Sequence, residues 1–251
     1  MASMDYSLIA DLYDSYVTTN LDVPFYVQQA HGCGQILELM SGTGRVSIPL
    51  LEAGVSLTCV DSSPAMLDRL RKKVEARGLH ANIQEMDVCA LRLGKLFDLI
   101  LLPFHSFAEI VDPRMQQTAL LRIREHLKPE GRFICPLHNP HTRTKLIDGA
   151  RKVRGEFAAG EDGERLVLSS IERCSSIPGI VRGTQYYDIF DQEKHQLQHR
   201  EVSICFYLHT AESFEKMVEK AGYRVKAIFG DYEGGTFKAE ESPFMIWVLE
   251  L

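Results

Sequence analysis

The chain has 251 residues, of which 45% are hydrophobic and 25% charged, and it carries a formal net charge of −6. This length suits one large domain or one domain with an insert, and the acidic balance argues against a nucleic-acid-binding surface, which is usually basic. The six cysteines form no C-x-x-C pair, so the sequence indicates neither a zinc site nor a disulfide framework.

The N-terminal stretch predicts an amphipathic helix over Asp5–Val17, with apolar and tyrosine side chains at helical spacing. Two interpretations are open: a helix packed on the domain, or a lid whose tyrosines, including Tyr13, cover a ligand. No basic region followed by an apolar run precedes it, so no signal peptide is predicted. The longest apolar runs, such as Phe244–Leu249, are too short to span a bilayer. We therefore expect a cytoplasmic protein without membrane contact.

A second helix is predicted over Phe25–Ala30, and the stretch that follows, Ile36–Arg45, is typical of a short buried strand leading into a glycine turn. Gly42 and Gly44 permit positive φ and close approach of the backbone to a ligand. Val46–Leu51 begins a helix. Because open α/β sheets bind ligands at the carboxyl ends of their parallel strands, we predict a ligand site at this turn.

Strands and helices alternate from this turn to about residue 140, which is typical of a parallel sheet with helices on both faces. Ser63 and Pro64 supply an N-cap and a first helical residue, and Pro129–Gly131 reads as a turn. The predicted strands are Ser56–Val60, Asn82–Met86, Phe97–Leu102 and Arg132–Leu137, and a further helix is predicted over Arg114–Leu127.

The pattern changes between residues 153 and 208, where β-type stretches are divided by turns and no strong helix is predicted. These stretches are Leu166–Cys174, Val181–Phe190 and Glu201–Leu208, with breaks at Gly160–Gly163, Pro178–Gly179 and Asp191–Lys194. The α/β pattern then resumes with a helix over Ala211–Ala221 and strands over Tyr223–Phe229 and Met245–Leu249. We expect one domain over 1–152 and 209–251, interrupted by an antiparallel insert over 153–208. The insert would form a pocket wall, a homodimer contact or both.

Three acids occupy informative places in this pattern. Glu38 lies inside the first strand, Asp61 ends the second and Asp87 ends the third. An acid after the second strand can accept hydrogen bonds from ribose hydroxyls, and one after the third can accept them from an exocyclic amine. An acid beside the glycine turn disfavours a pyrophosphate and suits a cation. Together they predict a nucleoside that carries a positively charged amino group.

This arrangement resembles the class I S-adenosylmethionine-dependent methyltransferases, and the resemblance covers nearly the whole chain. Tyr13–Tyr16 and the antiparallel insert look most like the branch that methylates small molecules. The matching motifs are Glu38–Gly44 for the glycine turn, Val60–Pro64 for the ribose, Met86–Val88 for the adenine, Phe97–Ile100 with Pro103–Phe107 for the fourth strand, and Leu127–Gly131 before the fifth.

The resemblance implies a Rossmann-like seven-stranded mixed sheet and the cofactor S-adenosyl-L-methionine, with S-adenosyl-L-homocysteine as product. Asp61 would hold the ribose, and Asp87 with Val88 the adenine. The family usually has glycine where this chain has Met40, so that side chain must point away from the methionine end of the cofactor or reshape it. The full set of implied cofactor residues is Tyr13, Glu38, Met40, Gly42, Gly44, Asp61, Ser62, Met66, Asp87, Val88 and Pro103.

The expected reaction transfers a methyl group to an N or O of a small molecule. A histidine can accept a proton near neutral pH, and the candidates are His105, after the fourth strand, and His138, after the fifth. Each could instead only hydrogen-bond a loop. The pairs His138–His141 and His195–His199 have spacings that suit zinc, but neither has a recognisable third ligand, so no metal is expected.

Two alternatives remain at this point. A nicotinamide-dependent oxidoreductase needs a third small residue in the G-x-G-x-x-G pattern, and Ser47 occupies that place. That function would leave Glu38 and Asp87 without a role. A cofactor-binding or assembly module that has lost catalysis would account for Met40.

Overall fold

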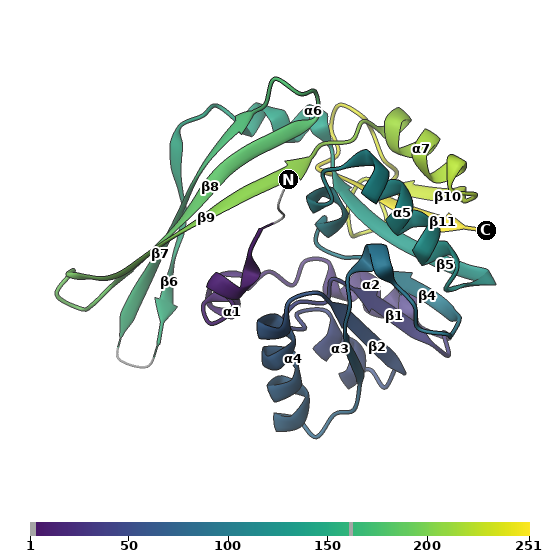
Figure 1. Cartoon of the computed structure of the whole chain (residues 1–251), viewed down its shortest axis with the longest axis horizontal. Coiled ribbons are helices and arrows are strands. Elements are labelled where there is room, and N and C mark those ends of the chain that lie inside the picture. Colours follow the sequence, from purple (N-terminus) through teal and green to yellow (C-terminus); the bar gives the residue numbers. More distant parts are fainter. Residues whose placement is uncertain (1–3, 161–162) are drawn as a thin grey trace.

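A seven-stranded mixed sheet forms the body of the protein in a computed structural model that describes residues 4–160 and 163–251 (Figure 1). Its strand order is β10-β11-β5-β4-β1-β2-β3, with parallel pairing from β5 to β3 and antiparallel pairing of β11 with β5 and β10. The strands are β1 (Ile36–Leu39), β2 (Leu57–Asp61), β3 (Asn82–Glu85), β4 (Phe97–Leu101), β5 (Leu127–His138), β10 (Arg224–Phe229) and β11 (Phe244–Glu250). The predicted Rossmann-like fold is therefore confirmed.

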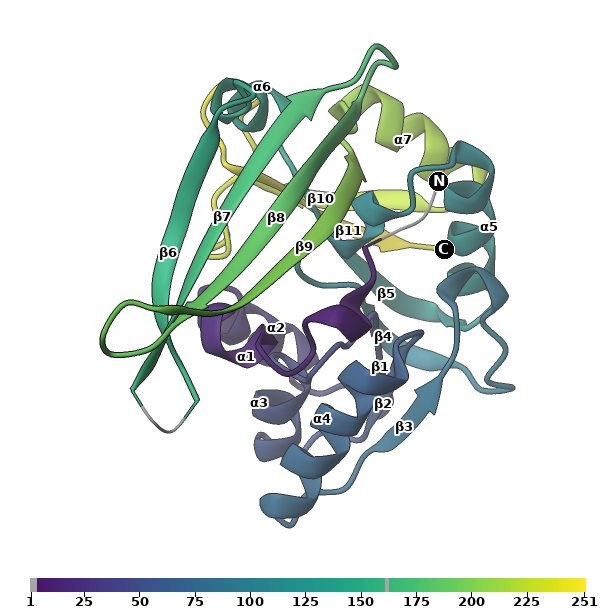
Figure 2. The ribbon, with the colours of Figure 1, turned by 60° about the vertical axis from the view of Figure 1, so that its left-hand side comes forward.

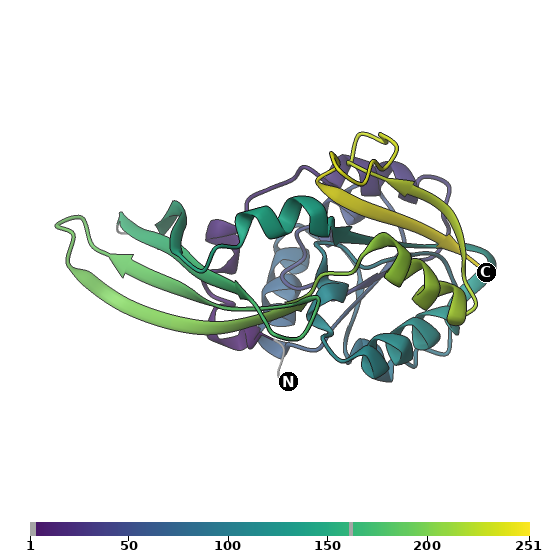
Figure 3. The same ribbon diagram turned by 90° about the horizontal axis from the view of Figure 1, so that it is seen from above.

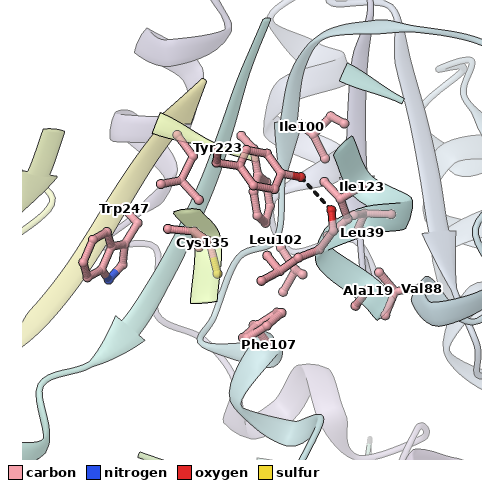
Figure 4. Packing of buried hydrophobic residues seen from close by; sticks show 14 of the residues in the cluster. Leu39, Val88, Ile100, Leu102, Phe107, Ala119, Ile123, Cys135, Tyr223 and Trp247 are labelled. Atoms are coloured by element: carbon pink, nitrogen blue, oxygen red, sulfur yellow. Dashed lines mark hydrogen bonds between the residues drawn. The ribbon is translucent and has the colours of Figure 1, made fainter. Parts of the chain in front are cut away.

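Helices cover both faces of this sheet, because the central strands are apolar on both sides. Helices α2 (Val23–Ala30), α3 (Ser47–Glu52) and α4 (Pro64–Ala76) pack on one face, around Ile36 and Leu99. Helices α5 (Pro113–Arg124) and α7 (Ala211–Lys220) pack on the other. Figure 4 shows part of that second core, where Leu39, Phe107 and Trp247 are buried and the Tyr223 hydroxyl donates to the Leu120 carbonyl at 2.9 Å.

The insert is a separate four-stranded antiparallel sheet in the order β6-β7-β8-β9, and it projects from one side of the body (Figures 1 and 3). Short helices α6 (Pro140–Arg143) and η4 (Thr144–Leu146) lead into it. The strands are β6 (Arg151–Ala159), β7 (Glu164–Cys174), β8 (Ile180–Phe190) and β9 (Gln196–Tyr207). The predicted break at Gly160–Gly163 falls between β6 and β7, but residues 161–162 of it lie outside the described residues.

The N-terminal segment differs from its prediction. The expected helix over Asp5–Val17 is two short pieces, the 3₁₀ helix η1 (Tyr6–Leu8) and α1 (Tyr13–Tyr16). The segment lies between the insert and the body (Figure 2). Its apolar residues Ile9 and Leu12 are buried against the insert rather than along one helical face. Tertiary packing therefore overrides the local helical spacing.

A second difference concerns Pro129–Gly131, which was expected to be a turn and lies inside β5. The pairing of β5 with β4 shifts register at this point, between Phe97 and Leu99. Gly131 lies close to β4 there, since a Cβ atom on it would come 2.9 Å from the Phe97 carbonyl oxygen. The stretch thus continues the strand through an irregularity. No helix in the described part of the chain is long and apolar enough to cross a membrane.

Candidate active site

Three adjoining cavities lie at the carboxyl ends of β1, β2, β3 and β4, with volumes of about 520, 180 and 30 Å³. Met40 lines all three, and Ser62 and Glu109 line both the first and the second. We call the three cavities together the groove. All the predicted cofactor residues except Gly44 line it, namely Tyr13, Glu38, Met40, Gly42, Asp61, Ser62, Met66, Asp87, Val88 and Pro103.

Asp61 ends β2 and lines the first cavity. Its Oδ2 accepts from the Gly42 N–H and its Oδ1 from the Ser63 N–H, both at 2.8 Å. Burial raises the pKa of this carboxyl, while these backbone hydrogen bonds favour its charged form. The carboxylate therefore ties the glycine turn to the end of β2. The Gly42 N–H donates within the protein and is not free to bind a ligand.

Asp87 and Val88 line the second cavity, beside the first. Asp87 is the N-cap of the 3₁₀ helix η2 (Val88–Ala90), where its Oδ1 accepts from the Cys89 N–H at 2.7 Å. Because Ser62 and Met40 border both cavities, Asp61 and Asp87 open onto one shared groove rather than onto separate surfaces.

Glu38 lines the third and smallest cavity together with Tyr13 and Pro103. Its side chain is only 1% exposed, and its Oε2 accepts from the Ser47 hydroxyl at 2.5 Å. Burial raises the pKa of this carboxyl to about 8. Glu38 can therefore gain or lose a proton near neutral pH according to what occupies the groove.

Met40 has φ 52°, a left-handed backbone conformation that glycine adopts at least cost. This explains in physical terms why glycine suits the position. Its side chain borders every part of the groove, so it shapes the space available to a ligand.

Gly44 has a packing role in the structure, and its expected contact with the cofactor stays a prediction. It lines none of the three cavities, and a Cβ atom on it would lie 2.3 Å from Leu70 Cδ1. The glycine lets α4 pack closely against the turn. Met66, also on α4, is buried and lines the first cavity as well.

His105 and His138, the predicted proton acceptors, stack on each other with ring centroids 3.9 Å apart, but neither lines the groove. Phe104 and Ser106, on either side of His105 in the chain, do line it. Burial lowers the pKa of His105 to about 3 and that of His138 well below its ordinary value. Both rings are neutral at pH 7 and are poor proton acceptors there. These features disfavour the expected role of the two histidines, which stays a prediction.

Glu109 is a groove residue that the sequence analysis missed. It ends the 3₁₀ helix η3 (Ser106–Glu109) and lines the first and second cavities. Its Oε1 accepts from the Tyr6 hydroxyl at 2.5 Å, and burial raises its pKa to about 7. The available signal was an acid within the otherwise apolar run Phe107–Val111.

The N-terminal segment is also attached to the glycine turn. Asp14 Oδ1 accepts from the Thr43 hydroxyl and from Lys73 Nζ, both at 2.6 Å. Tyr6 and Tyr13 from the same segment line the first cavity. The segment therefore lies along the groove, and its tyrosines as a lid over a ligand stay a prediction. Among the described residues, no group of three or more His, Cys, Asp or Glu side chains could hold a metal ion.

Comparison with known proteins agrees with this geometry. A family model described as a methyltransferase domain matches residues 36–131, which span β1 to the start of β5. Over 220 residues the chain is 28% identical to the cypemycin N-terminal methyltransferase of Streptomyces sp, covering 86% of this chain and 82% of that protein.

Two solved structures share the fold across almost the whole chain. One is an S-adenosylmethionine-dependent methyltransferase from Clostridium acetobutylicum ATCC 824, with a TM-score of 0.82, 18% identity and 98% of each chain covered. The other is a sugar N-methyltransferase from Streptoalloteichus sp ATCC 53650, with a TM-score of 0.69, 20% identity and coverage of 98% of this chain and 89% of that one. The chain is thus similar to methyltransferases in sequence, with the family model matching residues 36–131, and in fold over almost its whole length.

Proposed function

We propose that the groove binds S-adenosylmethionine and that the protein transfers its methyl group to a nitrogen or oxygen of a small molecule. The observation that carries the proposal is the shared groove onto which Asp61 and Asp87 open from consecutive strand ends. The ribose would lie against Asp61, the adenine against Asp87 and Val88, and the amino-acid end near Glu38.

The charges in the groove fit this cofactor. The first cavity is lined by three carboxylates, those of Asp5, Asp61 and Glu109, and by no basic side chain among its described residues. Such a site favours a sulfonium over a pyrophosphate. The Gly42 N–H, which a dinucleotide would use, already donates to Asp61. Both features disfavour the nicotinamide alternative.

The cofactor supplies an electrophilic methyl group on a positively charged sulfur. The protein binds and orients the two reactants and excludes water, which in favourable cases accounts for ~7–11 kcal/mol of a barrier. Asp61 fixes the glycine turn, Met40 sets the width of the groove, and the N-terminal segment covers it.

Nitrogen is the acceptor atom that we favour. By their names, the two methyltransferases compared above act on the N-terminus of cypemycin and on a nitrogen of a sugar. An ammonium acceptor also suits a cavity lined by carboxylates. The expected homodimer, with the insert as its contact, stays a prediction that light scattering can test.

Isothermal titration with S-adenosylhomocysteine tests the proposed function directly. We expect binding by the wild-type protein and a loss of at least about tenfold in affinity for Asp61→Ala, because a hydrogen bond to a charged group contributes ~1.5–3 kcal/mol. Asp68→Ala is the matched control, since Asp68 is an exposed acid on α4 that lines no part of the groove. No binding at millimolar ligand would contradict the proposal.

A further inference from the structure

Glu109 shares the first cavity with Asp61 and the second with Asp87, but it comes from a different part of the sheet. Asp61 and Asp87 follow β2 and β3, whereas Glu109 follows β4, which lies on the opposite side of β1 in the sheet. Its helix η3 packs against β9 of the insert. If the adenosyl group lies on the β2–β3 side, as the proposed function places it, an acceptor would approach the methyl group from the β4 side, where Glu109 lies.

Among the described residues, the charged groups that act on this carboxylate include no basic side chain. Four groups face it: Tyr6 on η1, Tyr13 and Tyr16 on α1, and Asp61 after β2. Each of them is neutral or acidic. A buried carboxylate without a cation is unfavourable unless it is protonated or finds a positive partner. Within the described chain its hydrogen-bond partner is the Tyr6 hydroxyl, from the segment that lies along the groove.

We propose that Glu109 receives the proton of an ammonium acceptor. In the absence of the acceptor, the Tyr6 hydroxyl occupies the hydrogen-bonding site on this carboxylate, and the acceptor displaces it on binding. The inference rests on the proposed function and extends it, because it assigns both the proton acceptor and the ionic state of the substrate that enters. An alcohol acceptor would offer the carboxylate no positive charge.

The step balances in atoms and charge. The acceptor nitrogen gives one proton to a Glu109 carboxylate oxygen and so exposes its lone pair. That lone pair forms the new bond to the methyl carbon while the electron pair of the carbon–sulfur bond stays on sulfur. Because burial raises the pKa of Glu109 to about 7, the carboxylate can take up and release this proton near neutral pH.

The experiment uses full-length protein labelled with ¹³C-glutamate and loaded with S-adenosylhomocysteine, with loading checked by calorimetry. The Glu109 carboxyl resonance is identified by its loss in Glu109→Gln and followed against pH. The probe is methylammonium chloride. The control is tetramethylammonium chloride at equal ionic strength, which carries the same charge but has no N–H to donate.

We expect methylammonium to lower the pKa of Glu109 by about one pH unit or more, because a nearby opposite charge favours the carboxylate, and tetramethylammonium to lower it much less. An unchanged pKa, or equal shifts with both cations, would overturn the proposal. If S-adenosylhomocysteine itself does not bind, the proposed function fails instead, so the two failures are distinguishable.

Tyr6→Phe is a second variant that keeps the carboxylate. The Tyr6 hydrogen bond lowers the pKa of Glu109, so its loss should raise that pKa in the protein without methylammonium. At a pH above the pKa of Glu109 in both proteins, where the carboxylate is charged, methylammonium should bind roughly tenfold more tightly because the competing hydroxyl is gone. Weaker or unchanged binding of methylammonium would show that Tyr6 does not hold the acceptor's place.

Discussion

Glu38 illustrates how one buried side chain can make the stability of this protein depend on pH. Its carboxyl group is 1% exposed, with the Ser47 hydroxyl as its hydrogen-bond partner. Burial moves its pKa from an ordinary 4.5 to about 8 in the folded chain. Between these two values the unfolded chain is charged at Glu38 and the folded chain is not.

We therefore expect the free energy of unfolding of the ligand-free protein to fall as pH rises from 4.5 to about 8. A group whose pKa is raised on folding contributes its full stabilisation at pH values below its pKa in the unfolded chain. This stabilisation is lost as the pH rises through the pKa of the folded chain. Glu38→Gln should remove this part of the dependence, on the order of a few kcal/mol. Urea unfolding at pH 5, 7 and 8.5 measures it.

The raised pKa of Glu109 also makes the free energy of unfolding fall as pH rises. The effect of Glu38 is therefore the difference in the free energy of unfolding between wild type and Glu38→Gln at each pH. Equal slopes for the two proteins would contradict the prediction.

A groove residue could be predicted only where the alternation of strands and helices along the chain fixed its position. Asp61 and Asp87 directly follow strands, and parallel strands bring their ends to one edge of a sheet, so their shared groove could be predicted. The Glu109–Tyr6 contact joins residues 103 positions apart, through a segment that folds as short irregular pieces. No local spacing encodes such a contact. His105 follows β4 as expected, whereas His138 is the last residue of β5 rather than following it, and the two rings stack on each other.

At the scale of elements, the turn between β1 and α3 depends on close packing against α4. Gly44 has φ 87°, and a Cβ atom there would overlap Leu70 Cδ1. Gly54, which follows α3, has a similar φ of 81° but no atom within 4 Å of the Cβ position. The two glycines therefore separate the cost of backbone conformation from the cost of overlap.

Gly54→Ala should lower the free energy of unfolding by ~1–2 kcal/mol, because alanine must adopt a left-handed backbone conformation. Gly44→Ala should lower it by that amount and by a further ~1–3 kcal/mol, because its Cβ atom overlaps Leu70. Urea unfolding of the two variants in parallel measures the difference. Equal losses would mean that Leu70 moves aside freely.

The elements themselves were predictable where hydrophobic periodicity was strong. The strands β1, β2 and β4 and the helices α4, α5 and α7 were placed within a few residues. The strand β6 was missed, because it lies at an edge of the insert and is largely exposed along Arg151–Ala159, which leaves little apolar alternation to detect. Pro129–Gly131 has the composition of a turn, and only its pairing with β4 makes it a strand.

At the scale of the whole molecule, the N-terminal segment joins the insert to the body. Ile9 is fully buried in a small core with Leu166, Tyr187 and other residues of β6 to β9. On the same segment Asp11 pairs with Arg200 of β9, and Asp14 pairs with Lys73 of α4. The segment is thus packed on one part of the fold and tied to the other.

Ile9→Ala should destabilise the insert more than the body. Removing a buried isoleucine side chain costs ~2–5 kcal/mol, and local units of a protein can open separately. We expect faster amide hydrogen exchange in β7, β8 and β9, with β1, β2 and β4 unchanged. Leu8→Ala, at a position that is 48% exposed, is the control. Uniformly faster exchange in both sheets would show that they unfold as one unit.

The positions of the two chain ends have a practical consequence for handling the protein. Met4 lines the first cavity, whereas Leu251 lies beside the edge strand β10, where Arg224 Nε donates to its carbonyl oxygen at 3.0 Å (Figure 1). Because Met4 lines this cavity, we expect a purification tag at the N-terminus to weaken ligand binding. A tag fused after Leu251 leaves from the opposite end of the sheet, so it is the better choice for every binding measurement.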